Sequence, residues 1–422
     1  MSENSQRFIS AGAVVAVLGA IYAGLVIRDR QDLGTQPKNY GPLLVSRDKD
    51  LIDVPAKSYY EGLVEKLERE YVDPISDENK LAAGAVRGMV LSLNDPLCLY
   101  YDKDEFPALV KRVSGQYEGI GVDLALVFPP GTEPKSGVMK SREDMMNAQY
   151  KVPNVVVTNV APGSPADKAG VKIGDIVQYV DERWVVNATE LLSFRDLSLA
   201  VSQGKGSAND LSARRKDLKK KLDHSMMPAK VLDKLTLGTS GSIKVVWRRG
   251  KEPFATSLAK AATTVPTGAQ PDGSFALRLA PESLPDLEKF IAGKKEVTID
   301  LRGVALGDFT TALKVIQLLG GGGDYGALKL NRDAKAKSIT FPGEPKSLKL
   351  TFLVNGATRG SAETLVNILA AKRGAKVTGQ ASGHPDAIDI IALPTGTGYS
   401  LYRGSYPLAG VQTRRETEER GS

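Results

Sequence analysis

The stretch VVVTNVAPGSPADKAGVKIGDIVQYV, residues 155–180, has the most compact pattern of the chain. Val155–Val160 is an apolar run typical of a strand. Residues 161–170 contain Pro-Gly and Ser-Pro pairs, which predict a turn that leads into a short helix. Gly174-Asp175 then opens a second strand at Ile176. Short strands with short connections predict a small β domain here.

The segments on either side extend this β domain to residues 115–258. Upstream, residues 115–124 form a glycine-punctuated turn that runs into a strand, and downstream Ser242–Trp247 predicts a further strand. Between them, residues of about 187–225 are charged and helical in pattern. We therefore expect a β domain that carries a helical insertion.

A helical leader, residues 51–114, precedes the β domain. Tyr59–Arg69 and Leu81–Leu93 carry apolar residues at helical spacing, and Asn94-Asp95-Pro96 ends the second helix.

Strands and helices alternate after the β domain, in residues 259–422. Strands are expected at Val297–Leu301, Leu348–Val354 and Ala375–Thr378, and helices at Phe309–Leu319 and Ala362–Ala371. This alternation predicts an α/β core with a parallel or mixed sheet. The four glycines at 320–323 lack a following Lys-Ser or Lys-Thr, so they predict a flexible turn and not a phosphate-binding loop. The fold class is therefore α+β or α/β with several domains.

The amino-terminal end predicts a membrane anchor. After a short tail, residues 1–8, residues 9–27 carry no charge and form a helix of about 28 Å, close to the thickness of a bilayer core. A cleaved signal peptide is the alternative, but no small-x-small cleavage site precedes Arg28. We expect a signal anchor followed by a linker at 28–50. The bulk of the chain would then lie in the periplasm or at the cell exterior.

Composition limits the chemistry that is possible. The chain of 422 residues has one cysteine (Cys98) and two histidines, His224 and His384. No disulfide framework or Cys-rich zinc site can form, and we expect neither a metal nor a cofactor. The formal charge is +7, and residues 203–234 hold nine Lys or Arg against four Asp. No aromatic residue is interleaved there, so nucleic acid is not expected. A solvated charged helix is the simple explanation, and a surface for anionic lipid or a partner protein is the alternative.

Several short motifs together resemble the carboxyl-terminal processing proteases, also called tail-specific proteases. They lie in this order along residues 51–410: Gly84–Met89, Gly119–Val122, Pro162–Ala166, Asp300–Arg302 and Val354–Gly356. The resemblance implies a PDZ domain that captures the free carboxyl end of a polypeptide. It also implies a peptidase core with a serine nucleophile and a lysine base.

The glycine-punctuated loop fits the first role. Successive backbone N–H groups at Gly119, Ile120, Gly121 and Val122 could form a nest for a terminal carboxylate, and the next strand could pair with the incoming peptide. The alternative is a plain glycine turn before a strand.

The catalytic positions of the family are vacant in this chain. The ungapped alignment places Gly360 at the nucleophile and Pro385 at the lysine, and no Lys or Arg lies between Lys376 and Arg403. Asp389 falls on the family's assisting glutamine, and one glycine of its oxyanion loop, Gly307, is kept.

Ser361 and His384 each lie one residue from a vacant position. If the backbone shifted, they could form a serine–histidine pair, because histidine is a competent base near neutral pH. The alternative is that Ser361 caps a helix that begins at Ala362, with His384 in an exposed loop.

The sequence therefore favours a membrane-anchored pseudoprotease or adaptor that binds polypeptide carboxyl termini or a partner protein. One alternative is an active serine endopeptidase that uses Ser361 and His384. A second is a membrane or partner scaffold that acts through the basic insertion.

Overall fold

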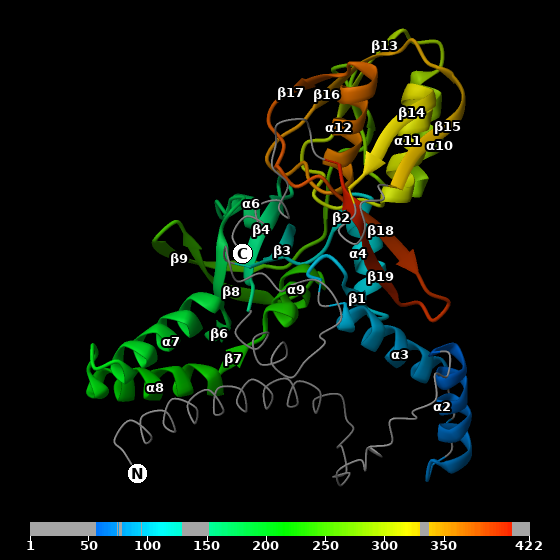
Figure 1. The fold of residues 1–422 in the computed structure, drawn as a ribbon. Coiled ribbons are helices and arrows are strands. Elements are labelled where there is room, and N and C mark those ends of the chain that lie inside the picture. Colours follow the sequence, from blue (N-terminus) through cyan, green and yellow to red (C-terminus); the bar gives the residue numbers. More distant parts are fainter. Residues whose placement is uncertain are drawn as a thin grey trace.

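The computed structural model describes residues 56–73, 75, 78–93, 95–128, 152–329 and 337–406. Its ribbon has three parts: leader helices, a β domain with a projecting helical hairpin, and an α/β core (Figure 1). A β domain and an α/β core are the two main parts that the sequence leads us to expect.

The leader begins with two helices at the predicted places, α2 (Ala56–Glu70) and α3 (Glu78–Ser92). None of the described helices is both long and apolar enough to cross a bilayer. The tail, the predicted anchor at 9–27 and the linker at 28–50 lie outside the described residues.

The second half of the leader packs on the core. Strand β1 (Tyr100–Tyr101) pairs with β19 (Gly398–Ser405) near the other end of the chain. Helix α4 (Glu105–Val113) buries Phe106 and Leu109 in a cluster that includes Ala280 of the core. Strand β2 (Gln116–Tyr117) then leads into the β domain.

The β domain is one antiparallel sheet with a short parallel end. Its strands run in the order β3-β4-β5-β6-β7, and β8 pairs with both β5 and β9. Among the described strands β3 pairs with β4 alone, so its second edge faces away from the sheet. The strands are β3 (Val122–Val127), β4 (Asn154–Val160), β5 (Ile176–Val180), β6 (Arg183–Val185), β7 (Ser225–Met226), β8 (Ser242–Arg249) and β9 (Glu252–Ala259).

Local capping explains where the helices of this domain begin. Ser164 accepts a hydrogen bond from the N–H of Asp167, and Pro165 follows it, so α6 (Pro165–Lys168) starts there. Side-chain oxygens of Asn187 and Ser207 cap the two helices of the insertion in the same way. The remaining helices are α7 (Ala188–Ser202), α8 (Ala208–Asp223) and α9 (Pro228–Thr236).

The core is built on a five-stranded sheet of order β11-β12-β13-β16-β17. Its last four strands are parallel, as the alternation of strands and helices predicts. The short strand β10 (Thr263–Thr264) pairs with β2 and leads into it. The elements are β11 (Gly268–Ala269), β12 (Phe275–Ala276), η1 (Pro281–Ser283), α10 (Leu284–Ile291), β13 (Glu296–Asp300), α11 (Phe309–Gly320), β14 (Gly321–Leu328), β15 (Lys337–Pro345), β16 (Lys349–Leu353), α12 (Ser361–Arg373), β17 (Lys376–Thr378) and β18 (Asp386–Ala392).

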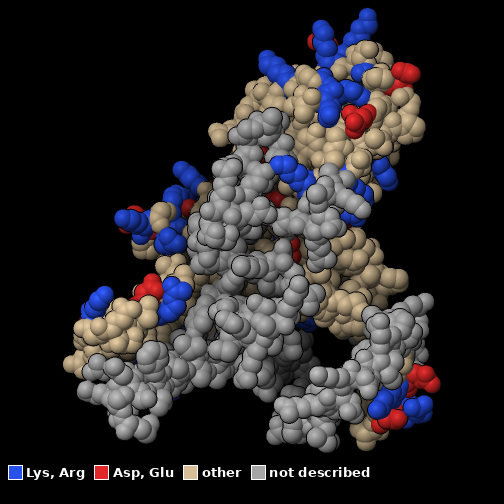
Figure 2. Space-filling view, in the orientation of Figure 1, with Lys and Arg blue, Asp and Glu red and all other residues tan. Residues whose placement is uncertain are grey.

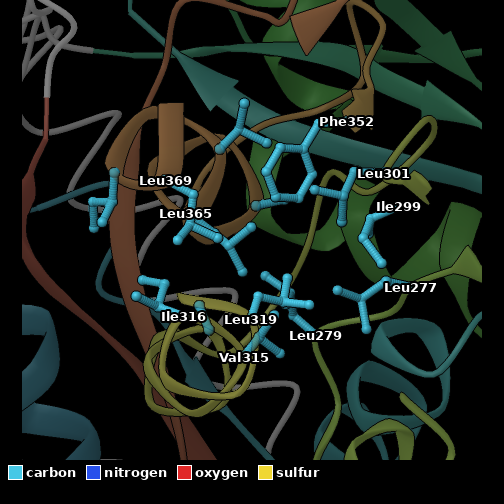
Figure 3. Close-up of a cluster of buried hydrophobic side chains, with 14 of the residues drawn as sticks. Leu277, Leu279, Ile299, Leu301, Val315, Ile316, Leu319, Phe352, Leu365 and Leu369 are labelled. Atoms are coloured by element: carbon cyan, nitrogen blue, oxygen red, sulfur yellow. The ribbon is translucent and has the colours of Figure 1, made fainter. Parts of the chain in front are cut away.

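Alternate residues of β13 and β16 point into one apolar cluster. Ile299 and Phe352 are fully buried there against Val315 of α11 and Leu365 of α12 (Figure 3). Because α12 is anchored on both the sheet and α11, its amino-terminal end is held rigidly at the carboxyl ends of the strands.

The prediction of a flexible turn at residues 320–323 is wrong. Gly320 ends α11, and Gly321–Gly323 open β14, which pairs with β15. A Cβ atom at Gly322 would overlap the backbone of Gly343 on the facing strand. The glycines therefore allow two strands to approach closely, which a sequence pattern alone does not reveal.

Candidate functional site

The start of α12 is formed around glycine. Gly360 is the N-cap residue, with φ +61° and ψ −131°, a conformation that favours glycine. Its N–H donates to the carbonyl of His384 at 2.8 Å. A Cβ atom there would meet only the carbonyl oxygen of Asp386, at 3.4 Å. Space is therefore available at this position, and backbone conformation is the obstacle to a side chain.

Ser361 is the first residue of the helix and is 1% exposed. Its Oγ donates to the carbonyl of Ile388 at 3.1 Å and accepts from the N–H of the same residue at 3.1 Å. The prediction that Ser361 caps a helix beginning at Ala362 is wrong, because Gly360 takes the cap position without a side-chain bond. The serine hydroxyl instead ties α12 to β18.

Glu363 fixes the loop that carries His384. Its carboxylate accepts from Ser382 Oγ at 2.7 Å, from the N–H of Gly383 at 3.0 Å and from the N–H of His384 at 3.0 Å. Burial raises the pKa of Glu363, and these three donors oppose that rise. His384 is half-buried, not exposed as one prediction had it. The loop and the start of α12 thus come together, as the sequence suggests for Ser361 and His384.

Gly307 lies on the loop between β13 and α11. A Cβ atom there would come within 2.7 Å of the Leu279 side chain, so packing requires glycine at this position. The next residue, Asp308, caps α11 through the N–H of Thr311 at 2.7 Å and accepts the N–H of Ile390 at 3.0 Å. The loop is therefore fixed against both α11 and β18.

Asp389 lies beside a small cavity of about 170 Å³. Its carboxylate is 8% exposed and pairs with Arg403 at 2.7 Å, and Thr310 Oγ1 donates to it at 3.2 Å. The cavity wall is otherwise mainly apolar, with Phe309, Leu313, Leu328, Ile339 and Phe341.

The glycine loop of the β domain already has hydrogen-bond partners. The N–H of Gly119 donates to the carbonyl of Gly238 at 2.7 Å, and the N–H of Ile120 donates to Leu235 at 2.9 Å. Gly119 and Gly121 both have positive φ, so the loop has the sharp curvature that a nest requires. Ile120 and Val122 are fully buried. The loop thus has the predicted shape, and the end of α9 occupies two of its donors.

The comparisons with known proteins agree with this architecture. The family model "Activating protease CtpB N-terminal domain" matches residues 58–105, and the PDZ domain model matches 131–198. The carboxy-terminal processing protease CtpB of Bacillus subtilis is 26% identical over 236 residues, 55% of this chain and 41% of the relative. A probable CtpA-like serine protease of Staphylococcus haemolyticus is 24% identical over 303 residues, 71% of this chain and 51% of the relative.

The leader and the PDZ domain of this chain are therefore similar to those of the carboxy-terminal processing proteases. It spans about half the length, or less, of the curated relatives named above. Among solved structures, a photosystem II D1 C-terminal processing protease aligns over 86% of this chain and 91% of its own, at 16% identity and a TM-score of 0.47.

The resemblance gives two residues near the start of α12 a predicted meaning. The ungapped alignment places the family's nucleophile at Gly360 and its lysine at Pro385, which is buried and whose carbonyl accepts the N–H of Tyr406. The nearest hydroxyl along the chain, that of Ser361, uses its donor and its acceptor on the backbone of β18. Among the residues that the structure describes, no group of three or more His, Cys, Asp or Glu is arranged to hold a metal ion.

A buried polar network joins the PDZ domain to the core, and the sequence did not single it out. Asp123 on β3 is 1% exposed and accepts from Tyr117 Oη at 2.9 Å and from Asn159 Nδ2 at 3.0 Å. Asn159 also donates to the carbonyl of Gly303 at 3.1 Å, and the N–H of Gly303 donates to Asn355 Oδ1 at 3.1 Å. Burial raises the pKa of Asp123, which the positive charge of Arg112 opposes.

A signal for this network was present in the sequence. Asp123 and Asn159 are polar residues within apolar strand runs, and buried polar groups need hydrogen-bond partners. A cleft of about 570 Å³ opens beside the network, between β4 and the loop that follows β13. Asp300 and Arg302 form a two-bond ion pair on its wall, with nitrogen–oxygen distances of 3.0 and 2.6 Å.

Proposed function

We propose that this chain is a membrane-anchored family member that binds polypeptide carboxyl termini through its PDZ domain and does not hydrolyse peptide bonds. One observation carries the proposal: the helix that should present the nucleophile is preceded by Gly360 as its N-cap residue, and glycine has no side chain that could attack. The loss of both nucleophile and base removes several orders of magnitude in rate, and an oxyanion-binding loop alone cannot form an acyl intermediate. What remains for function is the PDZ domain.

The first test is proteolysis by the full chain in detergent. We expect unfolded casein to be cleaved no faster with the native chain than in the buffer blank. The Ser361→Ala and His384→Ala variants should behave like the native chain. Cleavage that disappears in Ser361→Ala would overturn the proposal and favour an endopeptidase that uses the Ser361–His384 pair.

The second test is peptide binding. Fluorescein-labelled decapeptides ending in Val, Ala, Lys or Asp would be titrated as free acids and as amides. We expect the free acids with apolar ends to bind, because Ile120, Val122, Val231 and Leu235 form the apolar surroundings of the loop. Amidation should abolish binding, since the nest recognises a carboxylate. Equal binding of acid and amide would contradict capture of a carboxyl terminus.

We also propose that residues 9–27 anchor the chain and leave its bulk in the periplasm or at the cell exterior. The support is the uncharged sequence alone. The full chain should then resist alkaline carbonate extraction of membranes, and Val15→Asp combined with Leu18→Asp should release it. Protease added to spheroplasts should digest the bulk of the native chain, and a protected chain would contradict the orientation.

A second candidate function comes from the basic insertion. Arg215, Lys216, Lys219 and Lys220 are exposed on one face of α8, and none forms an ion pair within the described part of the chain. By contrast, Arg214 and Lys221 pair with Glu190 and Asp217 on the inner side of the hairpin. Figure 2 shows Lys and Arg side chains on this hairpin, at the lower left of the molecule. Like charges at this spacing destabilise a helix. Attraction to an anionic membrane surface, which contributes about 1 kcal/mol for each Lys or Arg, would offset that repulsion.

Lipid docking can be measured at Ser212, which lies on the same face of α8. Cys98 is buried, so Ser212→Cys can be labelled selectively with an environment-sensitive fluorophore. In the presence of vesicles that contain phosphatidylglycerol we expect a blue shift of the fluorophore's emission. Vesicles of phosphatidylcholine alone should cause no shift, and the double variant Lys219→Glu/Lys220→Glu should show none with either lipid. Arg195→Glu on α7 is the control, since Arg195 is already bonded to Asp196. A shift that does not depend on lipid charge would reject this candidate.

A further inference from the structure

The cavity beside Asp389 is bounded by three separate parts of the core. Helix α11 forms one side, the hairpin β14–β15 the second, and the strand pair β18–β19 the third (Figure 1). Its lining does not include Gly307, Gly360 or Ser361. The start of α12 and the predicted oxyanion loop therefore do not account for this cavity.

The body of the cavity is apolar. Phe309 and Leu313 are four residues apart on α11, so their side chains lie on one face of the helix. Ile339 and Phe341 alternate along β15 and lie on the same side of that strand. The volume of about 170 Å³ is similar to that of an engineered apolar cavity of about 150 Å³ that binds benzene. A phenyl ring or a branched alkyl group therefore fits.

The polar end of the cavity carries a guanidinium group with free donors. Arg403 Nη1 donates to Asp389 Oδ2 at 2.7 Å, and within the described chain Nε and Nη2 of Arg403 have no hydrogen-bond partner. The Arg403 side chain is 33% exposed, so a ligand can reach it. The Nε and Nη2 edge of a guanidinium presents two parallel N–H groups, which match the two oxygens of a carboxylate.

The backbone and a neighbouring carboxylate hold Arg403 in this position. The pairing of β18 with β19 has a bulge, at which Ala387 opposes Gly404 and Ile388 opposes Tyr402, so Arg403 has no partner residue. Bulges re-aim side chains and are common next to active sites. Asp389 is fixed in turn, because its other oxygen accepts from Thr310 Oγ1 at 3.2 Å. The guanidinium is therefore preorganised for a ligand.

A second cation lies at the rim of the cavity. Lys337, the first residue of β15, is exposed and forms no ion pair within the described part of the chain. It is two residues from Ile339, so its side chain lies on the same side of the strand. The described lining contains one carboxylate, Asp389, against the two cations. The excess of positive charge favours an anionic ligand.

We propose that this cavity binds a carboxylate with an apolar body. The phenyl or alkyl group occupies the space between α11 and β15, and the carboxylate accepts from Nε and Nη2 of Arg403. Two sources share this chemistry: a free aryl or alkyl carboxylic acid, and the last residue of a polypeptide that ends in an apolar side chain. The site does not involve the glycine loop, so it goes beyond the proposed function and does not depend on it.

A fluorinated acid tests the site in the full chain in detergent. We expect the fluorine resonance of 3-(4-fluorophenyl)propionate to broaden on binding. The corresponding amide should bind about tenfold more weakly or less, because it loses the charge-assisted bonds to Arg403. Micelles without protein are the blank. Equal affinity for acid and amide, or broadening no greater than with micelles, would overturn the proposal.

Variants of the lining connect the binding to this cavity. Arg403→Lys keeps a positive charge beside Asp389 but loses the planar pair of donors, so the affinity should fall about tenfold. Lys337→Met should weaken binding about threefold. Lys314→Met, at an exposed position of α11 outside the lining, is the matched control and should have no effect. The two lysines are exposed, so both variants should fold, and equal affinity in all four proteins would reject the site.

Competition identifies the source of the ligand. Acetyl-Gly-Gly-Phe, as a free acid, would be titrated against the bound fluorinated acid. If it does not displace the probe, the ligand is a free acid, and if it displaces the probe and binds at least tenfold more tightly, the ligand is a polypeptide end. Either result supports the site as long as Arg403→Lys weakens it. Decapeptide binding at the glycine loop should not respond to Arg403→Lys, so either proposal can fail without the other.

Discussion

The glycine loop of the PDZ domain and the start of α12 are both sharp glycine turns, and they differ in the groups that they offer to a ligand. At Gly119 and Ile120 the donors for a carboxylate are present, and the neighbouring helix occupies them. At Gly360, where the ungapped alignment places the family's nucleophile, the sharp backbone turn is present and there is no side chain. A binding site that is occupied by its own chain can be opened by a conformational change. A site without a nucleophile cannot be restored that way.

The largest effect is expected from Gly119→Ala. The new Cβ would combine a positive φ of +70° with an overlap on the Leu235 carbonyl, so we expect a loss of about 3 kcal/mol in unfolding free energy. Gly163→Ala is the matched control, with φ +76° and open space around its Cβ, and should lose about 1 kcal/mol. Urea unfolding of both variants measures the difference. Equal losses of unfolding free energy in the two variants would contradict a close contact between α9 and the loop.

An intermediate effect is expected from Glu363→Ala, at the other turn. Its removal leaves the N–H of Gly383 without this acceptor and leaves the N–H of His384 with the longer bond to Ser382 Oγ, at 3.3 Å, and should cost about 2 kcal/mol. Ser382→Ala removes only one of the three donors and should cost less.

The pH dependence of Glu363 supplies a second readout. Its pKa is raised in the folded state, so the native fold binds more protons there than the unfolded chain. The stability of the native chain should therefore fall relative to Glu363→Gln as the pH rises above about 4.5. Parallel curves for the two proteins would contradict the burial of this carboxylate.

The smallest effect is expected from Ser361→Ala. The hydroxyl makes two bonds to the backbone of Ile388, and its loss should cost about 1 kcal/mol in thermal unfolding, with no change in proteolysis. Ser92→Ala, at an exposed helix end, should cost less than about 0.5 kcal/mol. If the native chain cleaved casein and Ser361→Ala did not, the start of α12 would be an active site, and the contrast with the glycine loop would fail.

Local patterns in the sequence were sufficient for most of the architecture. Apolar periodicity predicted α2, α3, α11 and the parallel strands β13 and β16, because burial of one face follows from residue spacing. Counting without a gap from Val354-Asn355 and Glu363 places Gly360 and Pro385 at the family's catalytic positions, and this assignment stays a prediction. The role of His384 as a loop residue beside α12 was also within reach of the sequence.

The sequence by itself determined which side chains exist: it provides a glycine loop suited to a carboxylate, and no Lys or Arg between Lys376 and Arg403. Only the tertiary structure decided how those groups are used. The contact of α9 with the loop, the bonds of Ser361 to β18 and the pairing of Tyr100 with Tyr399 all join residues distant in the chain. Such contacts depend on how the elements pack in three dimensions, and local residue patterns do not specify that packing.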